Sequence, residues 1–358
     1  MARVFTNGFE LCDRGDQGGH DADMWFWDAD ETVRLSGNMY ADSSIVRVNG
    51  RSLKILPGSG SCYIAHYFSS KTEFYFRMAY RHDVGVRDDT NSLVRFLIPT
   101  GDDVKIRING STYFLSIDQG GVQRDIQTVK TILQTTWHLL EFHFKADAAN
   151  GRMELKCDGT TVCEYDGNTG TAGATGVKIG CLVDSFLFAY GTYWFDDLAM
   201  NDTSGTVNNS WVGDGHVVAL RPNGNGTYSE LTGSDGDQTD NYQLMDENPL
   251  DEADYVEGLS TGLRDSYQLQ SALSAGIPPG ATIKHVGATI VGKTLNVGAD
   301  ALEAFVRLSG SNYYATKQNL TGDWLGYKFD YSVNPGTLAA WTTAELDGAE
   351  AGLRTAAV

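Results

Sequence analysis

The chain has 358 residues, 41 glycines, 41% hydrophobic residues and a formal net charge of −19. This length and hydrophobic content suffice for two domains that each bury a core. The acidic excess argues against direct binding of nucleic acid or docking on anionic lipid, because both need clustered Lys and Arg. The opening residues show no apolar signal-peptide region, and no apolar run could span a bilayer, so we expect synthesis in a cytoplasm and no membrane insertion.

Short strand-like segments dominate residues 1–200. They are rich in β-branched and aromatic residues and are bounded by Gly, Asn or Asp, which is typical of antiparallel sheets. Asn49-Gly50, Asn109-Gly110 and Asp158-Gly159 favour hairpin turns because these dipeptides accept positive φ. We therefore predict one antiparallel jelly-roll sandwich over residues 1–203. The predicted strands are 44–50, 51–58, 62–68, 74–81, 93–99, 104–110, 113–117, 138–144, 152–159, 162–165 and 193–200.

A polar segment at 204–215, rich in Asn, Gly, Ser and Thr with a single Trp, is predicted to link two domains. Residues 216–358 then form a second, smaller β-sandwich domain. Near its end, Thr342 or Thr343 followed by Glu345 has the capping-box pattern of a short C-terminal helix. The strand-like runs of this domain are 266–273, 281–295, 301–310, 313–321 and 327–335.

The cysteines and histidines give no spacing typical of a metal site. We expect all five thiols, at positions 12, 62, 157, 163 and 181, to be reduced and mostly buried, without a zinc site. In the predicted hairpin Leu155 lies opposite Cys163 and Cys157 opposite Thr161, which sets the two sulfurs diagonally and too far apart to bridge easily. His138 and His143 stand five residues apart on one strand and therefore point to opposite faces.

Three segments of the first half resemble concanavalin A-like, laminin-G-type jelly rolls. Asn7–Glu10 (NGFE) is similar to their first strand, and Tyr193–Met200 (YWFDDLAM) is similar to their last. Between them, WHLLEFHF followed by GRMELKCDG resembles their central hairpin. The resemblance implies a concanavalin A-like fold over residues 4–200, and it leaves open whether the domain binds a ligand.

The second half resembles the C-terminal domain of structural proteins from tailed-phage virions. Residues 213–234, 240–258, 264–269, 277–290 and 341–353 carry this resemblance. It implies a non-enzymatic virion component, either a capsid decoration or a tail-side appendage, with the jelly roll as an exposed and adhesive module. The implied partners are other capsid or tail proteins, further copies of the chain in a homo-oligomer such as a trimer, and a host-surface glycan.

Two other functions compete with the virion role. The first is a freestanding carbohydrate-binding or adhesion protein. Sugar rings stack on aromatic side chains, and Trp25, Trp27, Tyr190 and Tyr193 are the candidates, although a sandwich of this size also needs aromatics in its core.

The second competitor is a laminarinase-type glycoside hydrolase. Glu345, Asp347 and Glu350 have the spacing of its carboxylate motif. They fall in the predicted C-terminal helix, where Glu345 would point away from the other two. We expect solvated helix charges there, and no catalytic residues.

A structural Ca²⁺ is the one cofactor the jelly-roll resemblance implies. In carbohydrate-binding jelly rolls the first-strand Glu and a last-strand Asp share this ion, and the matching residues here are Glu10 and Asp196 or Asp197. Carboxylates buried face to face need a cation. The alternative is that Asp196 accepts backbone N–H bonds while Asp197 faces solvent.

Overall fold

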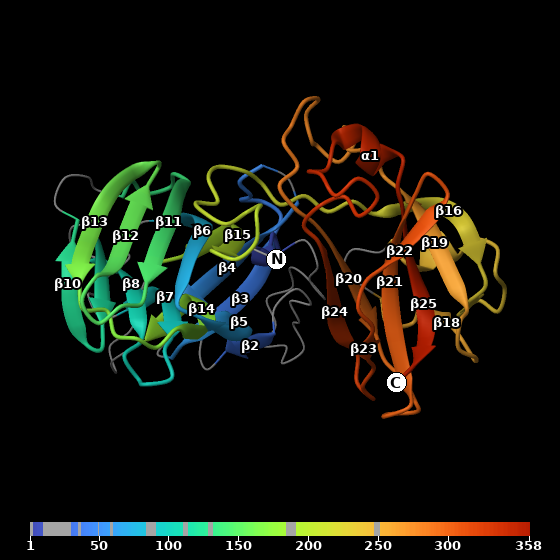
Figure 1. Cartoon of the computed structure of the whole chain (residues 1–358), viewed down its shortest axis with the longest axis horizontal. Helices are drawn as coiled ribbons and strands as arrows, with labels where there is room; N and C mark the ends of the chain where they lie inside the picture. Colours follow the sequence, from blue (N-terminus) through green and yellow to red (C-terminus); the bar gives the residue numbers. More distant parts are fainter. Residues whose placement is uncertain are drawn as a thin grey trace. The chain divides into compact units, whose positions relative to one another are not determined.

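The computed structural model describes residues 3–9, 30–34, 37–48, 50–57, 60–83, 91–109, 114–127, 132–183, 191–246 and 251–358. The chain divides into two compact units, the first ending at Val217 and the second starting at Val218. In both, nearly all of the regular secondary structure is antiparallel strand, blue to yellow-green in the first unit and yellow to red in the second (Figure 1), which confirms the predicted all-β class. No helix in the described residues is long and apolar enough to cross a membrane.

The first unit is a sandwich of two antiparallel sheets. We call them the front sheet and the back sheet. Among the described residues the front sheet has eight strands, in the order β13 (Thr160–Gly167), β12 (Gly151–Cys157), β11 (His138–Lys145), β6 (Glu73–His82), β15 (Tyr193–Asp202), β4 (Ser52–Pro57) and β3 (Gly37–Asp42), with β1 (Arg3–Asn7) paired to β15. The back sheet has seven, in the order β10 (Val122–Ile126), β9 (Phe114–Gln119), β8 (Val104–Asn109), β7 (Asn91–Leu97), β14 (Ala174–Val183), β5 (Cys62–Lys71) and β2 (Glu31–Arg34).

An aromatic core joins the two sheets. Phe96 of the back sheet packs against Phe74 and Phe142 of the front sheet, with ring centroids 4.8 Å and 5.3 Å apart. These rings come from alternate positions of β6, β7 and β11, so the residues between them point away from the core. The alternation therefore decides which side chains of β6 and β11 lie on the outer face of the front sheet.

The β12–β13 hairpin turns at Asp158-Gly159, as the sequence predicts. Both residues have positive φ, 50° and 77°, which a tight hairpin requires. Leu155 pairs with Cys163 as expected, but a bulge after Leu155 places Cys157 opposite Thr160 and not opposite Thr161. All four described cysteines are free and buried, whereas Cys12 lies outside the described residues.

Several segments of the first unit differ from the sequence prediction, which did not include β2, β3 or β10. Residues 44–48 form bends and not a strand, because Asp42 accepts the Ser44 N–H and Arg47 donates its N–H to Asp196. The central strand β14 was not predicted, since its glycines weaken the strand pattern. One of them, Gly180, is required because an added Cβ would overlap the Cys62 carbonyl. Residues 204–215 belong to the first unit and do not stand apart as a linker.

The second unit packs a larger sheet against smaller strand pairs. Its core contains Leu231, Tyr267, Phe329, Trp341 and Leu353. Among the described residues the larger sheet runs β16 (Pro222–Ser229), β19 (Arg264–Leu269), β25 (Glu350–Ala357), β21 (Asp300–Leu308) and β22 (Ser311–Tyr314), with β23 (Gln318–Asn319) on β21. The other pairs are β20 (Val286–Gly292) with β24 (Leu325–Tyr331) and β17 (Thr232–Gly233) with β18 (Val256–Glu257), and a 3₁₀ turn spans Asn241–Leu244.

The short C-terminal helix α1 covers Thr343–Asp347. Thr342 is its N-cap, and the reciprocal bonds between Thr342 and Glu345 complete the predicted capping box. The helix ends earlier than the sequence pattern indicates. Glu350 and the residues after it form β25 between β19 and β21, because each neighbouring strand offers it a full ladder of backbone hydrogen bonds.

Candidate functional site

Aromatic side chains gather on the outer face of the front sheet. Tyr75 of β6 and His143 of β11 are cross-strand neighbours, and their rings stack in parallel with centroids 4.3 Å apart. Trp211, from the segment after β15, lies 5.3 Å from Tyr75 and 5.9 Å from His143 at steep angles. Lys156 of β12 places its Nζ 3.6 Å from the centre of the Trp211 ring. We call these four residues the Trp211 cluster.

Charged groups surround the Trp211 cluster. Glu73 lies 2.9 Å from His143 Nε2. Glu154 accepts hydrogen bonds from Thr161 and Arg152, and these bonds hold the pKa of its carboxyl below the usual value in spite of the desolvation that opposes them. Burial lowers the pKa of His143, although Glu73 favours its charged form. The cluster therefore presents the partly exposed rings of Tyr75 and Trp211, with carboxylates, a lysine and a guanidinium at their edges.

The segment that carries Trp211 is tied to the front sheet by hydrogen bonds. Asn201 Nδ2 donates to the Ser210 carbonyl at 2.8 Å. The Gly213 N–H donates to Glu141 Oε1 at 2.7 Å, and Arg77 Nη1 donates to the Gly213 carbonyl at 3.1 Å. Val212 is buried between these ties. The backbone on both sides of Trp211 is thereby held in one place on the sheet.

The same segment ends at a buried ion pair. Asp197 has a φ of 53° at an irregularity in β15 and its side chain is 3% exposed. It accepts hydrogen bonds from Arg47 Nη1 at 3.1 Å, from His216 Nδ1 at 2.9 Å and from the Val217 N–H at 2.7 Å. Arg47 also donates a hydrogen bond to Asp214. Burial alone would lower the pKa of the guanidinium, but the Asp214 carboxylate helps to raise it above the usual value.

The two predicted calcium ligands on β15 have protein partners. Asp196 accepts the backbone N–H groups of Arg47 and Asp197, as the alternative expected. Asp197 is buried and does not face solvent. Its contact with the Arg47 guanidinium fills a position that a cation would take, so Asp197 fits a calcium ligand poorly. The third predicted ligand, Glu10, lies outside the described residues, and the calcium site stays a prediction.

The predicted sugar-binding aromatics are only partly described. Trp25, Trp27 and Tyr190 lie outside the described residues. Tyr193 is 1% exposed in the core of the sandwich, so it offers no ring to a ligand. Trp211 and Tyr75 were missed, because the polar composition around Trp211 indicates a linker. The one sequence signal was a lone Trp among Asn, Ser and Gly residues.

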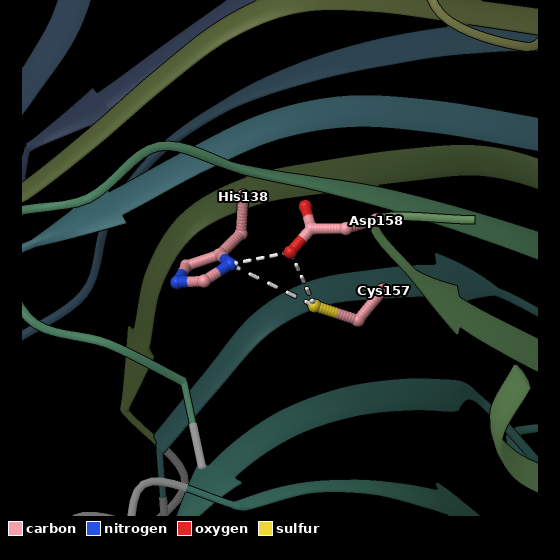
Figure 2. A group of neighbouring side chains, drawn as sticks. All are labelled: His138, Cys157 and Asp158. Atoms are coloured by element: carbon pink, nitrogen blue, oxygen red, sulfur yellow. Dashed lines mark hydrogen bonds and ion pairs between the residues drawn. The ribbon is translucent and has the colours of Figure 1, made fainter. Parts of the chain in front are cut away.

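A second group of reactive side chains lies at the tip of the β12–β13 hairpin. Figure 2 shows His138, Cys157 and Asp158 pointing toward one another. His138 Nδ1 lies 2.9 Å from Asp158 Oδ2, and Cys157 Sγ lies 3.9 Å from the first atom and 3.7 Å from the second. His143 points to the opposite face, as expected from its spacing. Cys157 and Asp158 both lie next to the same ring atom, Nδ1. A catalytic triad needs the nucleophile and the acid on different ring nitrogens, so these three residues cannot relay a proton in that way.

The laminarinase-like carboxylates of the second unit all have structural partners. Glu345 belongs to the capping box, Asp347 accepts the Ala272 N–H, and Glu350 accepts hydrogen bonds from Thr227 and Ser266. Asp347 and Glu350 also line a polar pocket of about 480 Å³. The motif is split between a helix and a strand, so its spacing does not reproduce three carboxylates on one strand.

No protein-family model matches the chain, and no curated protein matches it. Solved structures with similar folds include the cellulose-induced protein Cip1, with 15% identity over 59% of this chain and all of that one, at a TM-score of 0.43. Another is the carbohydrate-binding module CBM66 from Bacillus subtilis, with 10% identity over 48% and 94% of the two chains and a TM-score of 0.33. A third is domain 4 of the arabinanase AbnA from Geobacillus stearothermophilus in complex with arabinotriose, with 11% identity over 56% and 92% and a TM-score of 0.37.

Proposed function

We propose that the protein binds carbohydrate through the Trp211 cluster and does not cleave it. The observation that carries the proposal is Trp211 itself, a partly exposed indole held on the outer face of the front sheet by Glu141, Arg77 and Asn201. An aromatic ring in this setting offers a flat apolar surface with polar groups at its edge.

The side chains around Trp211 match the chemistry of a sugar ring. The C–H face of a pyranose can pack on Trp211 and Tyr75, while its hydroxyl groups can bond to charged donors and acceptors at the edge. Glu73, Glu154 and Lys156 supply these groups. Hydrogen bonds to such charged groups contribute roughly 1.5–3 kcal/mol each, so a few of them with one stacked ring give a usable affinity.

Glycan binding by the full chain tests the proposal. An array of plant, bacterial and algal glycans identifies a ligand, and calorimetry then measures its affinity. Trp211→Ala should weaken binding by about tenfold or more, because it removes a stacked aromatic surface. Unchanged affinity in this variant would overturn the proposed site.

Trp324→Ala is the matched control. Trp324 of the second unit has similar neighbours. Lys293 Nζ lies 4.5 Å from the centre of its ring, and the ring of Tyr255 packs beside it. This variant should bind glycan as the wild type does. If it loses binding while Trp211→Ala keeps it, the ligand belongs to the second unit.

The absence of catalysis is part of the proposal. Glu141 and Glu154 are the glutamates on β11 and β12, and both are engaged by protein donors. Turnover of β-glucan that disappears in Glu141→Gln or Glu154→Gln would show a glycoside hydrolase instead.

The resemblance of the second half, residues 213–353, to virion proteins supplies the biological setting that we propose. The first unit would then be the exposed adhesive module of a tailed-phage particle, and the second unit would attach it to capsid or tail. Sedimentation of the protein with intact particles would support this setting, whereas a protein found only outside particles would favour a freestanding adhesion protein.

A further inference from the structure

We infer that His138, Cys157 and Asp158 form a site for one Zn²⁺ ion at the tip of the β12–β13 hairpin. Imidazole, thiolate and carboxylate are the ligands that zinc uses in proteins. The three donor atoms are separated by 2.9 Å, 3.7 Å and 3.9 Å. Tetrahedral zinc sets such atoms about 3.4–3.6 Å apart, so small side-chain shifts would seat the ion between them (Figure 2).

The turn makes this convergence possible. Cys157 and Asp158 are consecutive residues, and on a regular strand their side chains would point to opposite faces. Asp158 has a φ of 50°, and this conformation turns its carboxylate back toward the Cys157 sulfur. The sequence spacing therefore gave no sign of the site, and the prediction that the cysteines hold no zinc rested on spacing alone.

The surroundings of His138 suit a metal ligand. Its Nε2 lies 3.0 Å from the Leu133 N–H and 3.3 Å from the Leu133 carbonyl oxygen. Without metal, Nε2 can accept from the N–H while Nδ1–H donates to Asp158. With zinc on Nδ1, the ring proton moves to Nε2 and donates to the carbonyl, which is the usual second partner of a metal-bound histidine. The Leu133 N–H then gives up its hydrogen bond to Nε2.

The carboxylate of Asp158 is also held in place, because its Oδ1 accepts the Leu139 N–H at 2.8 Å. This bond leaves Oδ2 directed at His138 and Cys157. The Asp158 side chain is 39% exposed, whereas that of His138 is 3% exposed. A metal ion therefore enters from the Asp158 side, and a water molecule would complete its coordination there. Binding releases the Cys157 thiol proton to solvent.

Metal titration of the full chain tests the inference. We expect one Zn²⁺ per chain by calorimetry, and with Co²⁺ as the probe we expect a near-ultraviolet sulfur-to-cobalt charge-transfer band. Cys157→Ser should abolish the band and weaken Zn²⁺ binding by more than about 100-fold. Asp158→Asn keeps the turn, because Asn also accepts positive φ, and should weaken binding without unfolding the chain.

Cys163→Ser is the matched control. Cys163 is also buried in this hairpin, but its Sγ donates to the Leu115 carbonyl and not toward His138. This variant should keep both the band and the affinity. No band in the wild type, or the same band in Cys157→Ser, would overturn the inference.

Discussion

Glu141 of β11 and Gly213 are joined by a hydrogen bond of 2.7 Å across 72 positions of sequence. The bond fixes the segment that carries Trp211 to the outer face of the front sheet. Glu141 is 6% exposed, so its carboxylate faces protein groups and not solvent. The placement of Trp211 thus depends on a carboxylate that is distant in the sequence.

Glu141→Ala is expected to destabilise the protein by about 1–3 kcal/mol, because it leaves the Gly213 N–H without its acceptor. It should also weaken glycan binding by loosening the segment around Trp211. Urea unfolding and calorimetry measure the two effects. Glu141→Gln keeps an acceptor oxygen and should lose less than about 1 kcal/mol. Equal losses in the two variants would contradict the role of this hydrogen bond.

Asp197 and Asp214 contact the same guanidinium but should differ in their contribution to stability. The side chain of Asp197 is 3% exposed and that of Asp214 is 70% exposed. Asp197→Ala leaves Arg47 and His216 without a buried partner and should cost about 3 kcal/mol or more. Asp214→Ala removes an exposed ion pair and should cost less than about 1 kcal/mol. Similar losses in urea unfolding would show that burial does not separate the two carboxylates.

Calcium removal tests the cofactor prediction at Glu10 and Asp196. If an ion is bound there, EGTA should lower the melting temperature and added Ca²⁺ should restore it, since a ligand that binds only the folded state stabilises it. Asp196→Asn should remove the response to Ca²⁺. A melting temperature that does not change with EGTA or Ca²⁺ at any concentration would rule out a structural calcium ion.

His82 should make stability depend on pH between 6.5 and 4. Burial, with a smaller contribution from the charge of His138, lowers the pKa of His82 from 6.5 to about 4 in the folded state. Above pH 6.5 both states are neutral at this residue. Between pH 6.5 and 4 the unfolded state binds the proton and the folded state does not, so stability falls as the pH falls, by on the order of 3 kcal/mol in total.

His82→Phe should remove this part of the pH dependence. Urea unfolding at pH 8 measures the packing change alone. The titration of His82 is measured by how much of the stability difference between pH 8 and pH 4.5 is lost in the variant. We expect a smaller difference in the variant than in the wild type. The same pH dependence in both proteins would show that His82 does not titrate as assigned.

The sequence predicted local features well and long-range ones poorly. The Asp158-Gly159 turn, the opposite faces of His138 and His143, and the capping box of Thr342 depend on residues that are near in sequence, and the structure confirms them. Arg47 was assigned to a strand because its neighbours are β-branched, but its contacts with Asp196 and Asp197 come from residues 149 and 150 positions away. Such tertiary contacts override local strand propensity.

The candidate sites were missed for the same physical reason. Trp211 is useful because Glu141 and Arg77 hold it on a distant sheet, and a composition rich in Asn, Gly and Ser gives no sign of those contacts. The group of His138, Cys157 and Asp158 is assembled by one hairpin bulge and one residue with positive φ. Both features change side-chain direction without changing the hydrophobic pattern from which strands are predicted.

Assembly into a homo-oligomer is the remaining prediction. In the second unit β22 ends the larger sheet, and its four residues, Ser-Asn-Tyr-Tyr, include no charged residue, proline or glycine. A strand edge without such residues is open to pairing with another chain. Phage appendages stand on symmetric platforms, where several weak contacts made together give firm attachment. The resemblance to these proteins makes a trimer the expected state.

Salt should strengthen this assembly. Copies that each carry a net charge of −19 repel one another, and ions screen this repulsion beyond about 10 Å at 0.1 M and about 3 Å at 1 M. Light scattering of the full chain at low and high salt should therefore show a larger mass at high salt. Asn312→Lys would add a charge to β22 and should reduce the mass at both. A strict monomer at every salt concentration, together with single isolated copies on the particle, would refute the prediction.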